Sequence, residues 1–292
     1  MAGGHMVQGA NTMDDCIIEQ NWDGYSAEEH GIWRTLFERQ EKVLKGNVCQ
    51  EYLDGLDALG ITADEIPNFD RMNEELSKRT GWEVIPVPGL IPSRPFFDML
   101  ANRKFPSGNF IRKKDELDYL EEPDIFHDVF GHVPLLTNPA YADYMHAYGK
   151  AGDDAITHKG VKYLARLNWW TIEFGMIIKD GQPKIYGAGI ASSFAETKYA
   201  ASSPSPNFIK FDLERCLRTG YYIDDLQSSY FVIDSFEKLF EEAVERPFVP
   251  LYEEFNTMPD LNPFDFVDSD IILKKGDKEY WKDFPNTKTK LK

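Results

Sequence analysis

The sequence has few cysteines, a shortage of basic residues and no long hydrophobic run. Its three cysteines, Cys16, Cys49 and Cys216, are scattered, odd in number and without the close spacing of metal-binding pairs. This usage excludes a disulfide-rich secreted domain and predicts a reduced, cytoplasmic compartment. No stretch is long and apolar enough to span a membrane, and neither repeats nor low-complexity tracts occur.

Acidic residues dominate the charge of the chain. The 292 residues contain 49 Asp and Glu against 32 Lys and Arg, a formal net charge of −17. Such a surface repels nucleic acid and anionic membranes, so neither is expected as a partner and small-molecule chemistry is favoured. A hydrophobic content of 42% is enough for one large core, and no linker divides the chain.

Helical periodicity predicts a mainly α protein with a few short β-strands. Helices are expected at 26–46, 48–60 and 69–81, around His127, and at 138–152, 155–181 and 230–245. Prolines and glycines between Trp82 and Arg112 predict an ordered loop, "KIYGAGIASSF" (184–194) predicts short strand or turn pieces, and the chain after Phe248 is expected to be mostly irregular.

Two histidines stand five positions apart in "EEPDIFHDVFGHVP" (121–134). On an ideal α-helix, positions five apart diverge by roughly 140°, so His127 and His132 would not meet on one metal ion. Convergence requires a looser helix end, through a π-type turn or unwinding, and Gly131 and Pro134 supply that looseness. The alternative is that both histidines are structural.

A third candidate ligand is Glu173, a carboxylate inside the apolar segment "LNWWTIEFGMII". Burying a carboxylate is costly unless something binds it. Two histidines and one carboxylate are the ligand set of non-heme Fe(II) oxygenases, which leave other coordination positions open. A buried salt bridge, for example with Arg166, is the alternative for Glu173.

Four ordered motifs resemble the catalytic domain of the pterin-dependent aromatic amino acid hydroxylases: "GLIPSRPFF", "EPDIFHDVFGHVPLL", "NWWTIEFG" and "YGAGIASSFAE". The bacterial phenylalanine 4-hydroxylases look most similar. The resemblance implies a single hydroxylase-like catalytic domain at 22–264, after an N-terminal tail at 1–21 that opens with the expression-scar-like "MAGGHM", and before a C-terminal tail at 265–292. It implies a monooxygenase that converts L-phenylalanine to L-tyrosine with O2, Fe(II) and a tetrahydropterin.

The same resemblance, carried over motif by motif, implies roles for individual residues. The iron ligands would be His127, His132 and Glu173. The pterin site would include Gly89, Leu90, Ile91, Ser93 and Phe96, with Phe96 stacking on the pterin ring and Asp128 near the pterin. The substrate site would include Arg112 for the carboxylate, with Trp169, Gly189, Ser192 and Glu196 around the ring and backbone. For Arg112, the alternative is a solvated basic cluster with Lys113 and Lys114.

Departures from the family pattern leave the substrate open among phenylalanine, tryptophan and tyrosine. Many relatives have tyrosine at the position of Asn168, and mammalian relatives have threonine and proline at Leu120 and Glu121. A 2-oxoglutarate oxygenase would need a histidine followed two positions later by Asp or Glu, which is absent here. A zinc hydrolase is disfavoured by the five-residue spacing.

A metal-stabilised binding module without turnover is the alternative from a different class of protein. The segment after Phe264 lacks a sustained heptad pattern, so a monomer is expected.

Overall fold

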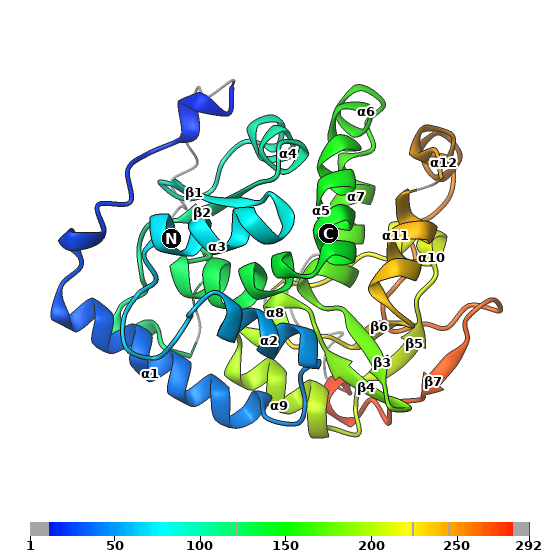
Figure 1. Cartoon of the computed structure of the whole chain (residues 1–292). Coiled ribbons are helices and arrows are strands. Elements are labelled where there is room, and N and C mark those ends of the chain that lie inside the picture. The colour runs from blue at the N-terminus through cyan, green and yellow to red at the C-terminus, as the bar shows by residue number, and fades with distance from the viewer. Residues whose placement is uncertain (1–11, 119, 121, 224, 245, 283–291) are drawn as a thin grey trace.

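The computed structural model describes residues 12–118, 120, 122–223, 225–244, 246–282 and 292. The predicted scar "MAGGHM" and the departure at Glu121 therefore lie outside the described residues. Helices occupy most of the described chain, and a five-stranded sheet lies to one side of them (Figure 1). The helices are α1 (Ala27–Leu44), α2 (Gln50–Ala58), α3 (Phe69–Thr80), α4 (Ser93–Ala101), α5 (Pro139–Lys150), α6 (Gly152–Thr157), α7 (Val161–Asn168), α8 (Ala188–Ala191), α9 (Phe194–Ser202), α10 (Leu213–Arg218), α11 (Phe236–Val244) and α12 (Phe248–Phe255).

Two π-helical segments and several 3₁₀ turns interrupt the α-helices. The π-helices are Phe126–His132 and Trp169–Glu173. The 3₁₀ turns are Asp14–Cys16, Trp22–Gly24, Lys114–Glu116, Val133–Thr137 and Glu279–Trp281.

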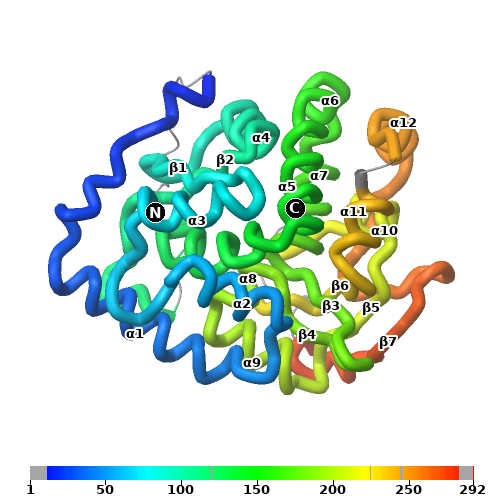
Figure 2. The backbone as a smooth tube through the Cα atoms, viewed as in Figure 1, coloured from blue at the N-terminus to red at the C-terminus, as the bar shows by residue number. Residues whose placement is uncertain are grey.

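The larger sheet has the strand order β4-β3-β6-β5-β7. Its strands are β3 (Met176–Lys179), β4 (Gln182–Ile185), β5 (Asn207–Lys210), β6 (Ser229–Ile233) and β7 (Ile272–Lys274). The central pairs β3–β6 and β5–β6 are parallel, and the edge strands β4 and β7 pair antiparallel. One hydrophobic core runs through helices and sheet, with α5 and α8 near the middle of the trace in Figure 2.

The helix predicted at 26–46 is confirmed as α1, and its start follows from side-chain capping. The Ser26 hydroxyl accepts from the Glu29 amide, while the Glu29 carboxylate accepts from the Ser26 amide. This reciprocal pair satisfies two donors that the first turn cannot use internally. The helices predicted at 48–60 and 69–81 are confirmed as α2 and α3.

The loop predicted between Trp82 and Arg112 is wrong, because this segment forms a β-α-β unit. Strands β1 (Glu83–Val87) and β2 (Lys104–Gly108) pair in parallel on either side of α4. Pro92 and Pro95 are compatible with α4 because Pro92 precedes the helix and Pro95 lies in its first turn, where no amide needs an internal acceptor.

Predictions for the later part of the chain need three corrections. The helix predicted at 155–181 is divided among α6, α7 and the π-helix that ends at Glu173, and the apolar residues after Gly175 form strand β3 instead. The helix predicted at 230–245 begins only at Phe236, because the apolar residues before it form the buried central strand β6. The segment after Phe248, expected to be mostly irregular, contains α12 and the edge strand β7. Among the described residues, every helix is too short or too polar to cross a bilayer.

Candidate active site

The π-helix Phe126–His132 solves the spacing problem of the two histidines. Hydrogen bonding in a π-helix runs from residue i to i+5, so side chains five apart lie on the same face. The Nε2 atoms of His127 and His132 are accordingly 3.2 Å apart. The predicted loosening of the helix is confirmed.

The second π-helix, Trp169–Glu173, brings the carboxylate to the same point. Glu173 Oε1 lies 3.3 Å from His132 Nε2, and Oε2 lies 3.6 Å from His127 Nε2. One donor atom from each of the three residues falls within 4.8 Å of the others. Asn168, five residues before Glu173, donates its side-chain amide to Glu173 Oε1 at 3.4 Å.

The salt bridge considered for Glu173 is wrong. Arg166 instead makes two hydrogen bonds to Asp260, of 2.8 and 2.6 Å. Within the described part of the chain, Glu173 therefore faces the two imidazoles and Asn168 without a permanent cation.

Helix α8 and the preceding Gly187 approach both π-helices closely through their backbones. A methyl group at Gly187, just before α8, would lie 2.3 Å from the Glu173 carbonyl oxygen. A methyl group at Gly131 would lie 3.0 Å from the Ala188 carbonyl oxygen. The glycines of "FGH" and "YGAG" are thus required for this approach, which sets the separation of Glu173 from the histidines.

Ser192, predicted to contact substrate, also orients His127. Its hydroxyl donates to the Ala188 carbonyl at 2.8 Å, so it accepts from Nδ1–H of His127, which is also 2.8 Å away. With the proton on Nδ1, the Nε2 lone pair points toward His132 and Glu173, as a metal ligand requires.

The local electrostatics favour an ionised carboxylate and a neutral His127. Burial, with the positive charge that His132 can carry, lowers the pKa of His127 to about 4. Burial would raise the pKa of Glu173, but the two facing imidazoles and the Asn168 amide outweigh it and lower that pKa to about 2. This is the protonation pattern of one anionic and one neutral ligand around a divalent cation.

A cavity of about 540 Å³ opens over the cluster. The predicted site residues that line it are Arg112, His127, Trp169, Glu173, Gly189, Ser192 and Glu196. Apolar side chains also line it, among them Leu117 and Phe194, and the exposed Ile223 lies where the cavity meets solvent, at its mouth. A cavity of this size suits a small aromatic molecule.

Arg112 does not belong to a solvated basic cluster. It is only 8% exposed, and its Nε and Nη2 atoms donate to the two carboxylate oxygens of Asp124 at 2.9 and 2.8 Å. Asp124 also accepts from the His127 amide at 3.1 Å. One buried carboxylate therefore joins the cationic side of the cavity to the π-helix that carries the histidines.

Glu196 and Trp169 are joined through Gln227, a residue that the motifs did not identify. The Gln227 amide donates to Glu196 Oε1 at 3.0 Å, and Trp169 Nε1 donates to Gln227 Oε1 at 2.9 Å. The Trp169 ring also stacks on Tyr221, with centroids 4.1 Å apart. Neither Gln227 nor Tyr221 lies in a quoted motif, so tertiary contact alone reveals them.

Burial also acts on Glu196 itself. It raises the pKa of Glu196 to about 7, against the hydrogen bonds from Tyr230 and Gln227.

The residues predicted to bind pterin do not line this cavity, and one of them, Leu90, contacts a residue that does. The Leu90 amide is 3.4 Å from a carboxylate oxygen of Glu122, a lining residue. Asp128 accepts from the Gly108 amide at 2.7 Å, and burial raises the pKa of Asp128 to about 7. Ser93 begins α4, the half-buried Phe96 packs on Phe97, and Ile91 packs against a small cluster that includes Val87. Gly89 precedes Leu90 in the same connection.

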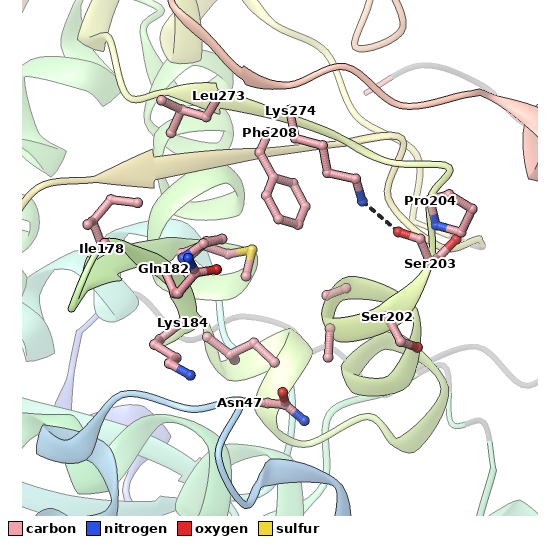
Figure 3. A pocket seen from close by; sticks show the side chains of 16 residues that line it. Asn47, Ile178, Gln182, Lys184, Ser202, Ser203, Pro204, Phe208, Leu273 and Lys274 are labelled. Carbon is pink, nitrogen blue, oxygen red and sulfur yellow. Dashed lines mark hydrogen bonds between the residues drawn. The ribbon is translucent and has the colours of Figure 1, made fainter.

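A second cavity, of about 740 Å³, lies apart from the site between β4, β7 and the end of α9 (Figure 3). It is larger, but it contains none of the predicted site residues. Its lysines, Lys184 and Lys274, donate to the backbone carbonyls of Gly46 and Ser203.

The chain belongs to the biopterin-dependent aromatic amino acid hydroxylase family, whose model matches residues 21–263. It is 50% identical to the phenylalanine-4-hydroxylase of Ralstonia nicotianae over 95% of this chain and 88% of the relative. Its identity to the phenylalanine-4-hydroxylase of Caulobacter vibrioides is 52%, over 91% of this chain and 90% of the relative.

Solved structures agree with this family. A cobalt-bound phenylalanine hydroxylase from Chromobacterium violaceum matches with a TM-score of 0.87 and 47% identity, over 88% of this chain and 93% of that one. The iron- and phenylalanine-bound structure of the enzyme matches with a TM-score of 0.85 and 46% identity, over 89% and 94%. The predicted family and fold class are confirmed, and a 2-oxoglutarate oxygenase or a non-catalytic module is set aside.

Proposed function

We propose that this chain is an iron- and tetrahydropterin-dependent monooxygenase that hydroxylates L-phenylalanine to L-tyrosine with O2. The observation that carries the proposal is the meeting of His127, His132 and Glu173 under a cavity that also contains a buried arginine. The phenylalanine-4-hydroxylase names of relatives at about half identity support the choice of substrate.

The donor set fits an iron ion. His127 presents a lone pair on Nε2 because its Nδ1–H donates a hydrogen bond to the Ser192 hydroxyl, and Glu173 is held ionised. Two imidazoles and one carboxylate are a donor set that would hold Fe(II). When bound, iron and the reduced pterin supply the activation of O2 and the two electrons that hydroxylation requires.

The protein itself contributes positioning and a dry pocket. Arg112, oriented by Asp124, would hold the carboxylate of the amino acid through its remaining donors. Trp169 and Gly189 would flank the ring and backbone of the substrate, near Ser192. Glu196, held by Tyr230 and Gln227, would support the far side of the pocket. This arrangement would hold the substrate ring near the metal, and the rate of hydroxylation depends on that positioning.

The pterin would bind beside this pocket, along the connection before α4. Phe96 would stack on the pterin ring, and the backbone and side chains of Gly89, Leu90, Ile91 and Ser93 would form the wall. Asp128, fixed by the Gly108 amide, would face the pterin.

We further propose a cytoplasmic monomer. The three cysteines are free and buried, which suits a reduced compartment. Sedimentation velocity at micromolar concentration tests the oligomeric state.

The test of function is product analysis with Fe(II), tetrahydropterin and O2, using phenylalanine, tyrosine and tryptophan separately. We expect tyrosine from phenylalanine, with the highest kcat/KM of the three substrates. A preference for tryptophan or tyrosine would reassign the substrate within the family. Pterin consumption without any hydroxylated product would contradict the proposal.

A further inference from the structure

The C-terminal segment lies outside the matched family region and contacts a residue that lines the active-site cavity. The family model ends at residue 263, whereas the 3₁₀ turn Glu279–Trp281 lies against α9 and the connection before β6. Both of these elements line the cavity: α9 contributes Glu196, and the connection contributes Ile223, Asp225 and Leu226. In Figure 1, a red part of the C-terminal segment accordingly lies beside α9.

Trp281 anchors this turn to α9. Its side chain is only 5% exposed, and its Nε1 donates to the Tyr199 hydroxyl at 2.9 Å in a buried hydrogen bond. The Tyr199 and Tyr280 rings lie 5.2 Å apart. Tyr199 is one turn along α9 from Glu196, so the docked turn and the cavity share one helix.

Tyr280 reaches from this anchor to the cavity mouth. Its hydroxyl donates to Asp225 Oδ1 at 2.7 Å. The same oxygen accepts from the Leu226 amide at 2.8 Å, so the contact fixes a turn of the mouth. Because the acceptor is a carboxylate, this bond is stronger than one between neutral groups.

The mouth turn is linked in turn to the substrate pocket. The side-chain amide of the buried Gln227 donates to the carbonyls of Tyr222 and Asp225, both at 3.1 Å. Its carbonyl accepts from Trp169, and its backbone amide donates to Glu196. Gln227 therefore connects Asp225 by hydrogen bonds with two residues of the proposed substrate site.

We propose that Tyr280 is a positioning residue for the amino acid substrate, acting through Asp225. The C-terminal segment ties the cavity mouth to α9, so that Trp169 and Glu196 keep the separation that the substrate ring requires. The expected effect on KM rests on the proposed function, whereas the expected effect of Tyr280 on the order of the turn at Asp225 does not depend on turnover.

The experiment compares wild type, Tyr280→Phe, Asp225→Ala and the double variant. Tyr280→Phe removes only the hydroxyl and keeps the ring against Tyr199. Tyr163→Phe is the matched control, because it removes a tyrosine hydroxyl that donates to Asn256, which does not line the cavity. The readouts are KM for phenylalanine, kcat, and amide exchange of the peptide spanning residues 220–228.

We expect Tyr280→Phe to raise KM for phenylalanine about 3- to 10-fold, which is the net effect of losing one solvent-accessible hydrogen bond, with kcat within about twofold. Amide exchange at 220–228 should accelerate, and Tyr280→Phe should have no further effect in the Asp225→Ala background. The control Tyr163→Phe should match wild type in all three readouts.

Two results would overturn the inference: unchanged amide exchange in Tyr280→Phe, or faster exchange with an unchanged KM. If wild type forms no tyrosine at all, the proposed function fails, and the exchange measurement still decides whether Tyr280 holds the mouth.

Discussion

Arg112 is held in place before any substrate arrives. The fully buried Asp124 accepts hydrogen bonds from Nε and Nη2 of the guanidinium. Nη1 is left without a hydrogen-bond partner among the described residues. The sequence predicted the role of this arginine only through family resemblance. Its carboxylate partner could not be predicted, because Asp124 is twelve positions away and the pairing depends on the folded chain.

Replacing Arg112 should lower kcat/KM for phenylalanine by more than the accompanying loss of stability accounts for. We expect Arg112→Ala to lower kcat/KM for phenylalanine by a factor that corresponds to about 2 to 5 kcal/mol of transition-state stabilisation, because a charged partner is removed from a buried site. Arg112→Lys should recover part of this, since lysine offers a point charge without the planar fork. Pterin oxidation should also become uncoupled from tyrosine formation.

The measurement is kcat/KM with the ratio of tyrosine formed to pterin consumed, beside the melting temperature of each variant. Lys113→Ala, at the exposed neighbouring position, serves as the control. Wild-type efficiency and coupling in a folded Arg112→Ala would remove this residue from the substrate site.

At the level of elements, two π-helices create the site. The five-residue spacing of the histidines predicted the first one, because an α-helix cannot bring them together. The second, Trp169–Glu173, was not predicted, since its residues continue the apolar pattern of α7 without a break. Strand β6 was missed for a related reason: a short apolar run is compatible with a buried strand or a helix.

The contact between α8 and Glu173 gives the element-scale prediction. Gly187→Ala places a methyl group 2.3 Å from the Glu173 carbonyl oxygen, so the two segments must separate. We expect a destabilisation of about 1 to 3 kcal/mol and weaker iron binding. Gly31→Ala is the control, because a methyl group there meets nothing within 4 Å and the substitution lies within α1. Unchanged iron affinity in a stable Gly187→Ala protein would show that this contact does not position the ligand.

At the scale of the whole molecule, the sequence predicted a single mainly α catalytic domain, and the comparisons with known proteins confirm it. The domain boundaries at residues 22 and 264 stay predictions, although β7, which lies beyond residue 264, pairs with β5 of the catalytic domain. The role of the end of the chain could not be predicted, because Tyr280 and Trp281 contact residues more than fifty positions away.

The free energy of unfolding should depend on pH through the ionisation of Glu196. Its pKa is raised from an ordinary value of 4.5 to about 7 in the folded protein, so the folded state keeps a proton that the unfolded state has lost. The stability that this proton provides is present at low pH and is lost as pH rises from about 4.5 to about 7. Glu196→Gln keeps the acceptor oxygen for Tyr230 but cannot ionise.

We therefore expect the melting temperature of Glu196→Gln, relative to wild type, to be higher at pH 8 than at pH 5. Thermal unfolding of both proteins across this range provides the measurement. Parallel pH profiles would mean that Glu196 does not carry a buried proton in the folded state.

The most direct test of the metal site is the iron stoichiometry of wild type, His132→Ala and His158→Ala. His158 is an exposed histidine outside the cluster, so His158→Ala controls for the loss of an imidazole. Iron bound after anaerobic loading with Fe(II) and gel filtration is measured together with tyrosine formation and the melting temperature. We predict one iron per chain and turnover in wild type and His158→Ala, and loss of both in a folded His132→Ala. One iron per chain with full turnover in His132→Ala would contradict the assignment of His127, His132 and Glu173 as the catalytic iron site.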